Sequence, residues 1–205
     1  MPRFAPLVVA IAVTITVACA ATRSGREPAG PTLTETIEAQ IAKDDAMPWV
    51  QRRPLTWADF QGRPPAAAGS VAAETAYTLI QGARCTGSTF EFRVVAAFRP
   101  KDSWVRPTML RTSADSAHAL RHEQTHFDLT EVHARRLRRY FSELMAPCRI
   151  ATGDLEGSAA RIGRDEKAAQ AQYDAETDHG RAVTQQTRWE RDVAAQLQTL
   201  AKFAR

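Results

Sequence analysis

The stretch His122-Glu123-Gln124-Thr125-His126 constrains this chain more than any other feature of its sequence. Two histidines four residues apart lie one above the other on a helix, so both rings can reach one metal ion. Glu123 lies about 100° round that helix, poorly placed as a ligand but able to reach a water beside the metal. A zinc ion makes such a water more acidic, and a carboxylate can take its proton. The pattern predicts a hydrolytic zinc site with His122 and His126 as ligands and Glu123 as general base.

The sequence around this stretch predicts one long helix over about residues 113–145. Polar residues that can cap a helix precede it, no glycine or proline interrupts it, and Pro147 ends it. After the motif, apolar residues recur every three or four positions, as one buried helix face requires: Phe127, Val132, Leu137, Tyr140, Phe141 and Leu144.

Four of the five histidines of the chain share one face of this predicted helix. His118, His122, His126 and His133 fall within about 80° of one another on a helical wheel. His118 and His133 are a turn or more from the motif pair. We therefore expect these two to support the ligands or to line a polar cleft, rather than to bind the metal directly.

A catalytic zinc site needs three protein ligands and one open position. Glu131 lies about 140° from His126 on the wheel, so the third ligand should come from another element. His179 is the only histidine outside the motif helix, and it falls where a second helix is predicted to end. We expect His179 as the third ligand, with Asp174 and Glu176 orienting its ring or replacing it. The alternative for His179 is an ordinary interaction with a helix C-terminus.

Residues 1–20 have the pattern of a secretory signal: one positive charge, a short apolar run and small residues at its end. Two endings remain open. Ala18-Cys19-Ala20 fits a small-x-small cleavage site, whereas Thr16-Val17-Ala18-Cys19 resembles a bacterial lipobox in which Cys19 would be lipidated. An uncleaved membrane anchor is the third interpretation. All three predict an exported protein of the periplasm or cell envelope, with a lipid anchor in the second case.

Residues 21–30 are small, polar or charged and predict a tether, which leaves residues 31–205 for a single domain. Apolar residues make up 44% of the chain and charged residues 24%, which excludes wholesale disorder. Apart from Cys19 the chain has two cysteines. In an oxidising compartment an isolated pair is a candidate disulfide, so we expect Cys85 and Cys148 to be bonded; two free thiols are the alternative.

The fold class predicted from periodicity is α+β, with a small antiparallel sheet packed beside the motif helix and two further helices. Residues 71–80 and 90–98 alternate as strands do, with a glycine-containing loop bearing Cys85 between them. Further elements are expected as a short helix from about residue 33 that ends near Asp44-Asp45, a helical turn at 56–60 that Thr56 and Asp59 cap, a short strand at 103–105, a helix from about residue 154 that ends at His179-Gly180, and a last helix over about 181–203.

The formal net charge of +4 says little about partners and leaves attraction to anionic phospholipid or acidic peptide open. Arg135, Arg136, Arg138 and Arg139 crowd the end of the motif helix, and such a charge run usually marks a solvated face. No aromatic interleaving or nucleic-acid motif accompanies these arginines, so we expect no nucleic-acid partner.

The chain resembles an uncharacterised bacterial family, domain of unknown function nine-two-two, described as predicted secreted zinc-dependent proteases. The resemblance covers nearly all of the chain after the tether and implies a zincin-like fold with metal-dependent peptide hydrolysis. It rests on Thr56-Trp57-Ala58-Asp59-Phe60-Gln61-Gly62, Ser103-Trp104-Val105, His122-Glu123-Gln124-Thr125-His126-Phe127-Asp128 and Tyr173-Asp174-Ala175-Glu176-Thr177-Asp178-His179-Gly180.

Two functions from different classes follow. The first is a zinc-dependent peptidase of the cell envelope that acts on a peptide or protein substrate, bound as an added strand at an exposed sheet edge. The second is a zinc-containing envelope protein that binds a partner and cleaves nothing. The sequence favours the first, because a structural zinc site prefers four protein ligands and has no use for Glu123. The substrate, the native metal and the oligomeric state are left open.

Overall fold

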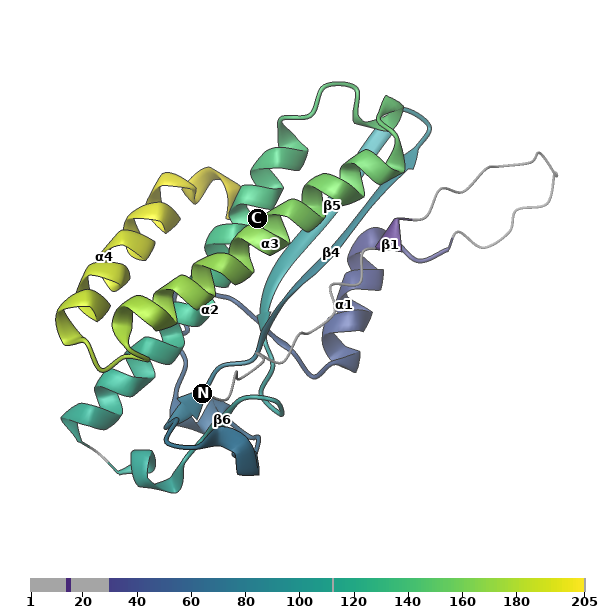
Figure 1. Ribbon diagram of the computed structural model, residues 1–205. Helices are drawn as coiled ribbons and strands as arrows, with labels where there is room; N and C mark the ends of the chain where they lie inside the picture. The colour runs from purple at the N-terminus through teal and green to yellow at the C-terminus, as the bar shows by residue number, and fades with distance from the viewer. Residues whose placement is uncertain (1–13, 16–29, 112, 205) are drawn as a thin grey trace.

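A computed structural model describes residues 14–15, 30–111 and 113–204. It confirms a mixed α+β protein with small antiparallel sheets and four α-helices (Figure 1). The expected secretory signal, its Cys19 and nearly all of the expected tether lie outside the described residues. Within the described residues, no helix is long and apolar enough to cross a membrane.

The centre of the fold is a long antiparallel hairpin of β4 (Tyr77–Thr86) and β5 (Thr89–Phe98), with an unbroken register from Tyr77 opposite Phe98 to Thr86 opposite Thr89. A two-residue turn with Gly87 at φ +61° joins the strands, which suits glycine because the left-handed region costs it nothing. The expected loop is therefore shorter than predicted, and Cys85 lies within β4. Residues expected as one strand over 71–80 are divided between β3 (Ala73–Glu74) and β4.

Two short strands extend the hairpin to a four-stranded sheet, and two others form a separate two-stranded sheet. β2 (Met47–Pro48) pairs with the end of β5, and β1 (Thr14–Ile15) pairs in parallel with β4. β3 pairs with β6 (Trp104–Val105), which confirms a short strand at the position predicted for 103–105. A capping box of Thr56 and Asp59 holds the short turn at Trp57–Asp59, also as predicted.

The helices are α1 (Leu33–Lys43), α2 (Ala114–Ser142), α3 (Thr152–Thr177) and α4 (Val183–Thr199). The motif helix α2 is 29 residues long, and Ser113 caps its start by accepting a hydrogen bond from the Ser116 main chain. Short 3-10 turns at Ala66–Ala68, Pro107–Leu110, Pro147–Arg149 and Ala201–Phe203 complete the chain.

The alternation along β5 sends its side chains to two different helical layers. Val94 and Ala96 pack with Leu137 and Phe141 of α2, whereas Ala97 packs with Ile37 of α1. Figure 1 shows α1 on one side of the hairpin and α2 on the other, with α3 and α4 alongside α2. The hairpin is thus covered on both faces, and α2 is buried between the sheet and the last two helices.

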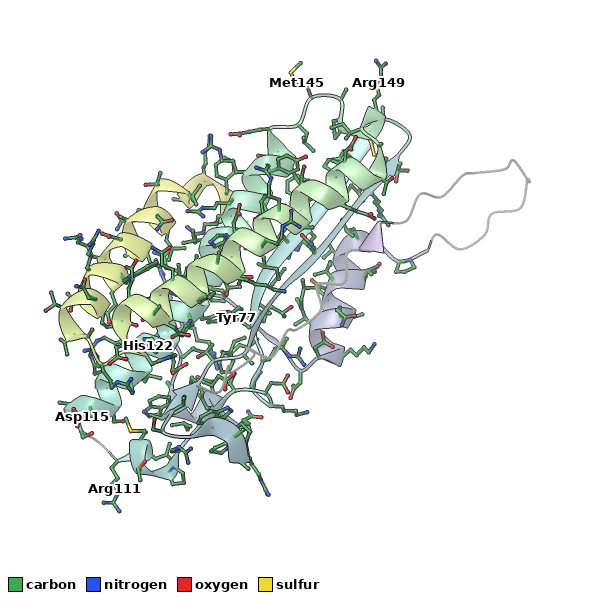
Figure 2. All side chains as sticks on the ribbon, in the orientation of Figure 1. Tyr77, Arg111, Asp115, His122, Met145 and Arg149 are labelled. Atoms are coloured by element: carbon green, nitrogen blue, oxygen red, sulfur yellow. A yellow bond between two sulfur atoms is a disulfide. The ribbon has the colours of Figure 1, made fainter. Side chains whose placement is uncertain are left out.

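The expected disulfide between Cys85 and Cys148 is present, with a Cα–Cα distance of 5.7 Å. It ties the turn end of the hairpin to the segment that follows α2. Figure 2 shows Met145 and Arg149 in this segment, projecting away from the rest of the protein. The bond closes a sequence separation of 63 residues and so restricts the unfolded chain.

The expectation of a solvated arginine face is wrong for two of its four residues. The side chains of Arg135 and Arg138 are 3% and 8% exposed and hydrogen-bond the buried carboxylate of Glu131. Their other donors reach main-chain oxygens of Leu197, Phe203 and Val94. These carbonyls come from elements distant in sequence, so only the tertiary structure could supply them.

His133 gives the fold a dependence on pH. The residue is 1% exposed, and burial together with the charge of Arg136 lowers its pKa to about 4. Between pH 6.5 and 4 the unfolded chain binds this proton and the folded chain does not, so stability falls as the pH falls. We expect the protonation of His133 to lower the free energy of unfolding by about 3 kcal/mol over that window. His133→Leu should flatten the dependence by this amount in urea unfolding at several pH values; an unchanged slope would contradict the assignment.

Candidate metal centre

His122, Glu123 and His126 lie on α2 where the helix passes between the sheet and α3. All three are buried, with exposed fractions of 5%, 5% and 8%. The two residues between them have structural partners: Gln124 accepts a hydrogen bond from the Leu55 main chain, and Thr125 donates one to the Arg121 carbonyl. Gln124 thus ties α2 to the segment that contains Leu55, whereas the bond of Thr125 stays within α2.

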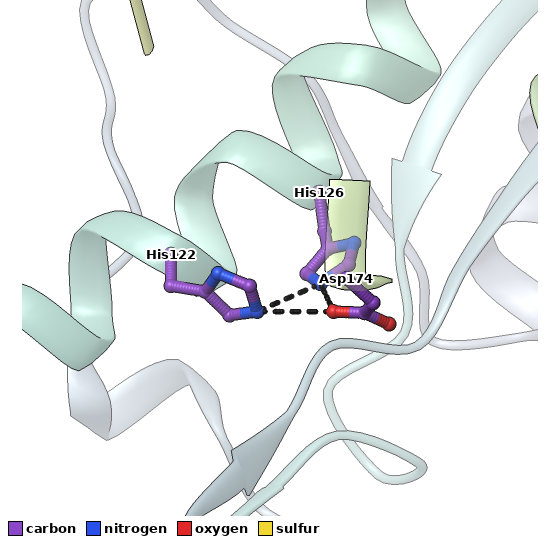
Figure 3. Close-up of side chains that lie close together, drawn as sticks. All are labelled: His122, His126 and Asp174. Carbon is purple, nitrogen blue, oxygen red and sulfur yellow. Dashed lines mark hydrogen bonds and ion pairs between the residues drawn. The ribbon is translucent and has the colours of Figure 1, made fainter. Parts of the chain in front are cut away.

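Asp174 of α3 completes a compact triangle with the two histidines (Figure 3). Its Oδ1 lies 3.2 Å from His122 Nε2 and 3.1 Å from His126 Nε2, and the two Nε2 atoms are 3.2 Å apart. Among the described residues, this is the one group of three side chains placed to hold a metal ion together. Asp174 was expected beside a third ligand and as a replacement for it.

His179, the expected third ligand, lies outside this triangle. Its Nδ1 is 3.5 Å from Asp174 Oδ1, and its side chain is 56% exposed. The reason is the backbone, because α3 ends at Thr177 and Asp178 and His179 then enter the left-handed region at φ +49° and +53°. The third side chain of the triangle is therefore Asp174 and not His179.

The turn after α3 packs directly against His122, the first histidine of the motif. Gly180 has φ +83°, and a Cβ at this position would lie 3.1 Å from Cγ of His122. His118 contacts the same turn through Nε2, 2.5 Å from the Gly180 oxygen. His118 thus supports the site indirectly, by holding the turn that packs against His122.

The other two expected supporting residues lie away from the triangle. Glu176 is on the surface, where its carboxylate accepts hydrogen bonds from Gln172 and Trp189. His133 shares the helical face of His126 but is seven residues further on, about 10 Å along the helix axis. The helical wheel therefore predicted the face of α2 on which His133 lies, but it does not show the distance along the helix axis that separates His133 from the triangle.

Sequence reasoning missed three buried side chains that surround the histidines. Gln186 Oε1 lies 3.0 Å from His122 Nδ1, and Gln170 Oε1 lies 2.7 Å from His126 Nδ1. Tyr173 stacks on the His122 ring with centroids 4.7 Å apart. A signal did exist in α3, where polar and aromatic residues recur at helical spacing on its buried face: Glu166, Gln170, Tyr173 and Thr177.

The electrostatics of the triangle favour a positive charge within it. Burial disfavours the charged form of Asp174, yet its hydrogen bonds to His122 and His126 hold the pKa of the carboxyl well below its usual range. Burial likewise disfavours protonated His126, but the hydrogen bond to Asp174 and its negative charge raise the pKa of the ring to about 9. The negative charge of Asp174 can therefore be balanced either by a proton on a histidine or by a metal cation.

The donor set fits zinc. Two imidazole nitrogens and a carboxylate oxygen are usual ligands of this ion, and three protein ligands with an open side are typical of catalytic sites. Zinc–ligand bonds of 2.0–2.1 Å in a tetrahedron imply ligand atoms about 3.3 Å apart. The observed separations of 3.1–3.2 Å are close to this value.

Glu123 is held beside the triangle without belonging to it. The Thr75 hydroxyl donates to its Oε2 at 2.8 Å, whereas its Oε1 has no hydrogen-bond partner among the described residues. Glu123 is three residues before His126 on the same helix, and its negative charge is one of the causes that raise the pKa of His126. A carboxylate oxygen thus remains able to accept a proton next to the candidate metal position.

Two further side chains lie near this region, Tyr77 at the start of β4 and Glu74 at the end of β3. Tyr77 lies nearly parallel to His126 with ring centroids 6.5 Å apart. Burial, together with the charges of Glu166, Asp174 and Glu74, raises its pKa, so its hydroxyl stays protonated. The Glu74 carboxylate accepts a hydrogen bond from Trp104, and its pKa is raised by partial burial and by the charges of Glu123 and Asp174.

The fold and the triangle together define an α+β protein with a buried cluster of two histidines and one aspartate. Residues 53–180, more than half of the chain, match the family model described as "Bacterial protein of unknown function (DUF922)", and the chain belongs to this family. The matched range includes Glu123 and all three members of the triangle, and it ends at Gly180. No curated protein and no solved structure matches the chain.

Proposed function

We propose that the protein is a zinc-dependent peptidase that hydrolyses peptide bonds in the bacterial cell envelope. His122, His126 and Asp174 would hold the ion, with Asp174 in the place first expected for His179, and Glu123 would be the general base. The observation that carries the proposal is the convergence of three ligand atoms beside a carboxylate that is not one of them. A site that only stores or fixes zinc has no need for that carboxylate.

Each side chain of the site would have a separate role in peptide hydrolysis. A bound zinc ion supplies a Lewis acid that makes water more acidic and polarises a carbonyl group. Glu123 takes the proton of the attacking water on Oε1, while Thr75 keeps the carboxylate in place through Oε2. Asp174, with 32% of its side chain exposed, lies toward the solvent side of the cluster. Substrate would therefore approach from that side.

The proposed substrate is a peptide or unfolded protein segment in extended conformation. β3 has β6 as its strand neighbour in the described part of the chain, so its other edge has no strand partner there. Thr75 follows β3 directly and donates a hydrogen bond to Glu123, so the end of β3 lies near the proposed base. A strand added at this edge would lie beside the reacting groups. The proposed location rests on the signal pattern in residues 1–20.

The ligand assignment is tested by zinc affinity. We expect one zinc per chain, and His126→Ala or Asp174→Ala should weaken binding by at least about tenfold, because each removes a ligand atom. His179→Ala is the matched control and should bind zinc like the parent, since its ring lies outside the triangle. Competition with a coloured chelator measures all three. Loss of zinc in His179→Ala with full affinity in Asp174→Ala would refute the assignment.

A further inference from the structure

We propose that Gln170 and Gln186 are positioning residues that fix the protonated nitrogen of each motif histidine and so keep the three ligand atoms bare for a divalent cation. The inference rests on the proposed function to the extent that zinc is that cation. Both amides are buried, 4% and 1% exposed, and each makes one hydrogen bond to a histidine Nδ1. Neither residue belongs to the triangle.

The orientation of Gln186 follows from its other partner. Its Nε2 lies 2.8 Å from a carboxylate oxygen of Glu190, which can only accept. The NH₂ group must therefore face Glu190, and Oε1 must face His122 and the hydroxyl of Tyr173, 2.7 Å away. An amide oxygen can only accept, so neutral His122 donates from Nδ1 and its Nε2 carries no proton.

The orientation of Gln170 follows in the same way. Its Nε2 donates to the main-chain oxygen of His126 at 2.9 Å and to Thr130 at 3.2 Å. A carbonyl oxygen cannot donate, so Oε1 of Gln170 is the atom that faces His126 Nδ1. Thr130 is in turn fixed by a hydrogen bond to the buried carboxylate of Glu166. Neutral His126 thus also carries its proton on Nδ1.

The two amides together create a site that requires a cation. With both Nδ1 atoms protonated and both rings neutral, His122 Nε2, His126 Nε2 and Asp174 Oδ1 present three lone pairs within 3.1–3.2 Å of one another. Such an arrangement is repulsive when it holds no positive charge, and it is favourable around a divalent ion, which meets all three lone pairs at once. Outer hydrogen bonds of this kind orient histidine ligands, and their loss typically costs about 10–100-fold in metal affinity.

The test uses the purified full chain and zinc alone. Methionine is close to glutamine in length but offers only a weak acceptor, so Gln170→Met and Gln186→Met should each weaken zinc binding by about 10–100-fold. Gln81→Met is the matched control, because Gln81 is also buried but lies in β4 outside the site. It should bind zinc like the parent.

A double variant shows whether weaker zinc binding comes from the lost hydrogen-bond acceptor or from altered packing or folding. Exchanging the two groups, Gln186→Glu with Glu190→Gln, rebuilds an acceptor beside His122 and a donor at position 190. We expect this double variant to keep zinc affinity within about threefold of the parent, whereas Gln186→Met does not. Equal weakening in both would show that volume or packing, rather than the acceptor, matters and would overturn the inference.

Nuclear magnetic resonance of the imidazole nitrogens gives a readout independent of hydrolysis. The zinc-loaded parent should show two Nδ1–H resonances that exchange slowly with water, and each methionine variant should lose one of them. Retention of both resonances and of full zinc affinity in the variants would overturn the inference and leave the proposed function standing. If the parent binds no zinc, the proposed function fails, and the nitrogen shifts of the neutral, metal-free rings still decide: protons on Nε2 overturn the inference, and protons on Nδ1 support it.

Discussion

Glu123→Gln is expected to leave zinc bound and to lower the rate of peptide hydrolysis by roughly two to four orders of magnitude, the usual contribution of a general base. Glutamine preserves the shape of the side chain and can still accept from Thr75, so the fold and the three ligand atoms should be unaffected. The change removes the carboxylate that accepts a proton. The rate is measured on an unfolded protein substrate, with zinc content determined on the same samples.

The matched control for this prediction is Glu176→Gln. Glu176 is an acid two residues after Asp174 whose carboxylate accepts surface hydrogen bonds from Gln172 and Trp189. It should retain parental activity, and a chelator should abolish that activity in both the parent and this control. Normal turnover by zinc-loaded Glu123→Gln would rule out the proposed mechanism and favour a protein that only binds zinc and a partner.

Glu131→Ala is expected to be the most destabilising single change outside the metal centre, at about 3–5 kcal/mol. Glu131 is 2% exposed, and it accepts hydrogen bonds from Arg135 at 2.8 Å and from Arg138 at 2.9 Å. Removing it leaves two buried guanidinium groups without a counter-charge. Because those arginines also bond carbonyls beyond α2, we expect the contacts of α2 with α4 and with β5 to weaken together.

The control is an ion pair of the same kind on the surface of the same helix. Arg139 and Glu143 are also four residues apart, and their side chains are 54% and 51% exposed. Glu143→Ala should cost only about 0.3–0.5 kcal/mol, as exposed helical pairs do. Urea unfolding of both variants measures the difference. Similar small losses in the two variants would show that the buried arginines are satisfied without Glu131.

The local elements of this fold were predictable because their signals are local. The motif helix, the alternating strand that became β5 and the capped turn at Trp57–Asp59 were all found from periodicity and capping residues. The disulfide was found by counting cysteines, and the structure confirms it. Each of these predictions uses spacings within one segment, or a pair that has no competing partner.

The choice between Asp174 and His179 could not be made this way, because it depends on where α3 crosses α2. His179 was favoured by residue type, being the one histidine outside the motif helix. Asp174 is still within α3, one residue after fully buried Tyr173, whereas His179 comes after the helix has ended and is itself left-handed, as is Asp178 before it. The orientation of α3 about its own axis therefore decides that the carboxylate of Asp174 faces the two histidines of α2.

The sequence by itself determined the α+β class, the disulfide and the helix that carries His122, Glu123 and His126, since spacing along one helix decides which side chains share a face. Only the tertiary structure decided which group meets the two histidines, which amides orient them, and that Arg135 and Arg138 are buried. All three outcomes depend on partners 44 or more residues away: Asp174, Gln170 and Gln186 for the histidines, and the carbonyls of Val94, Leu197 and Phe203 for the arginines. Such contacts are set by how helices and strands pack against one another, which no pattern within a single segment records.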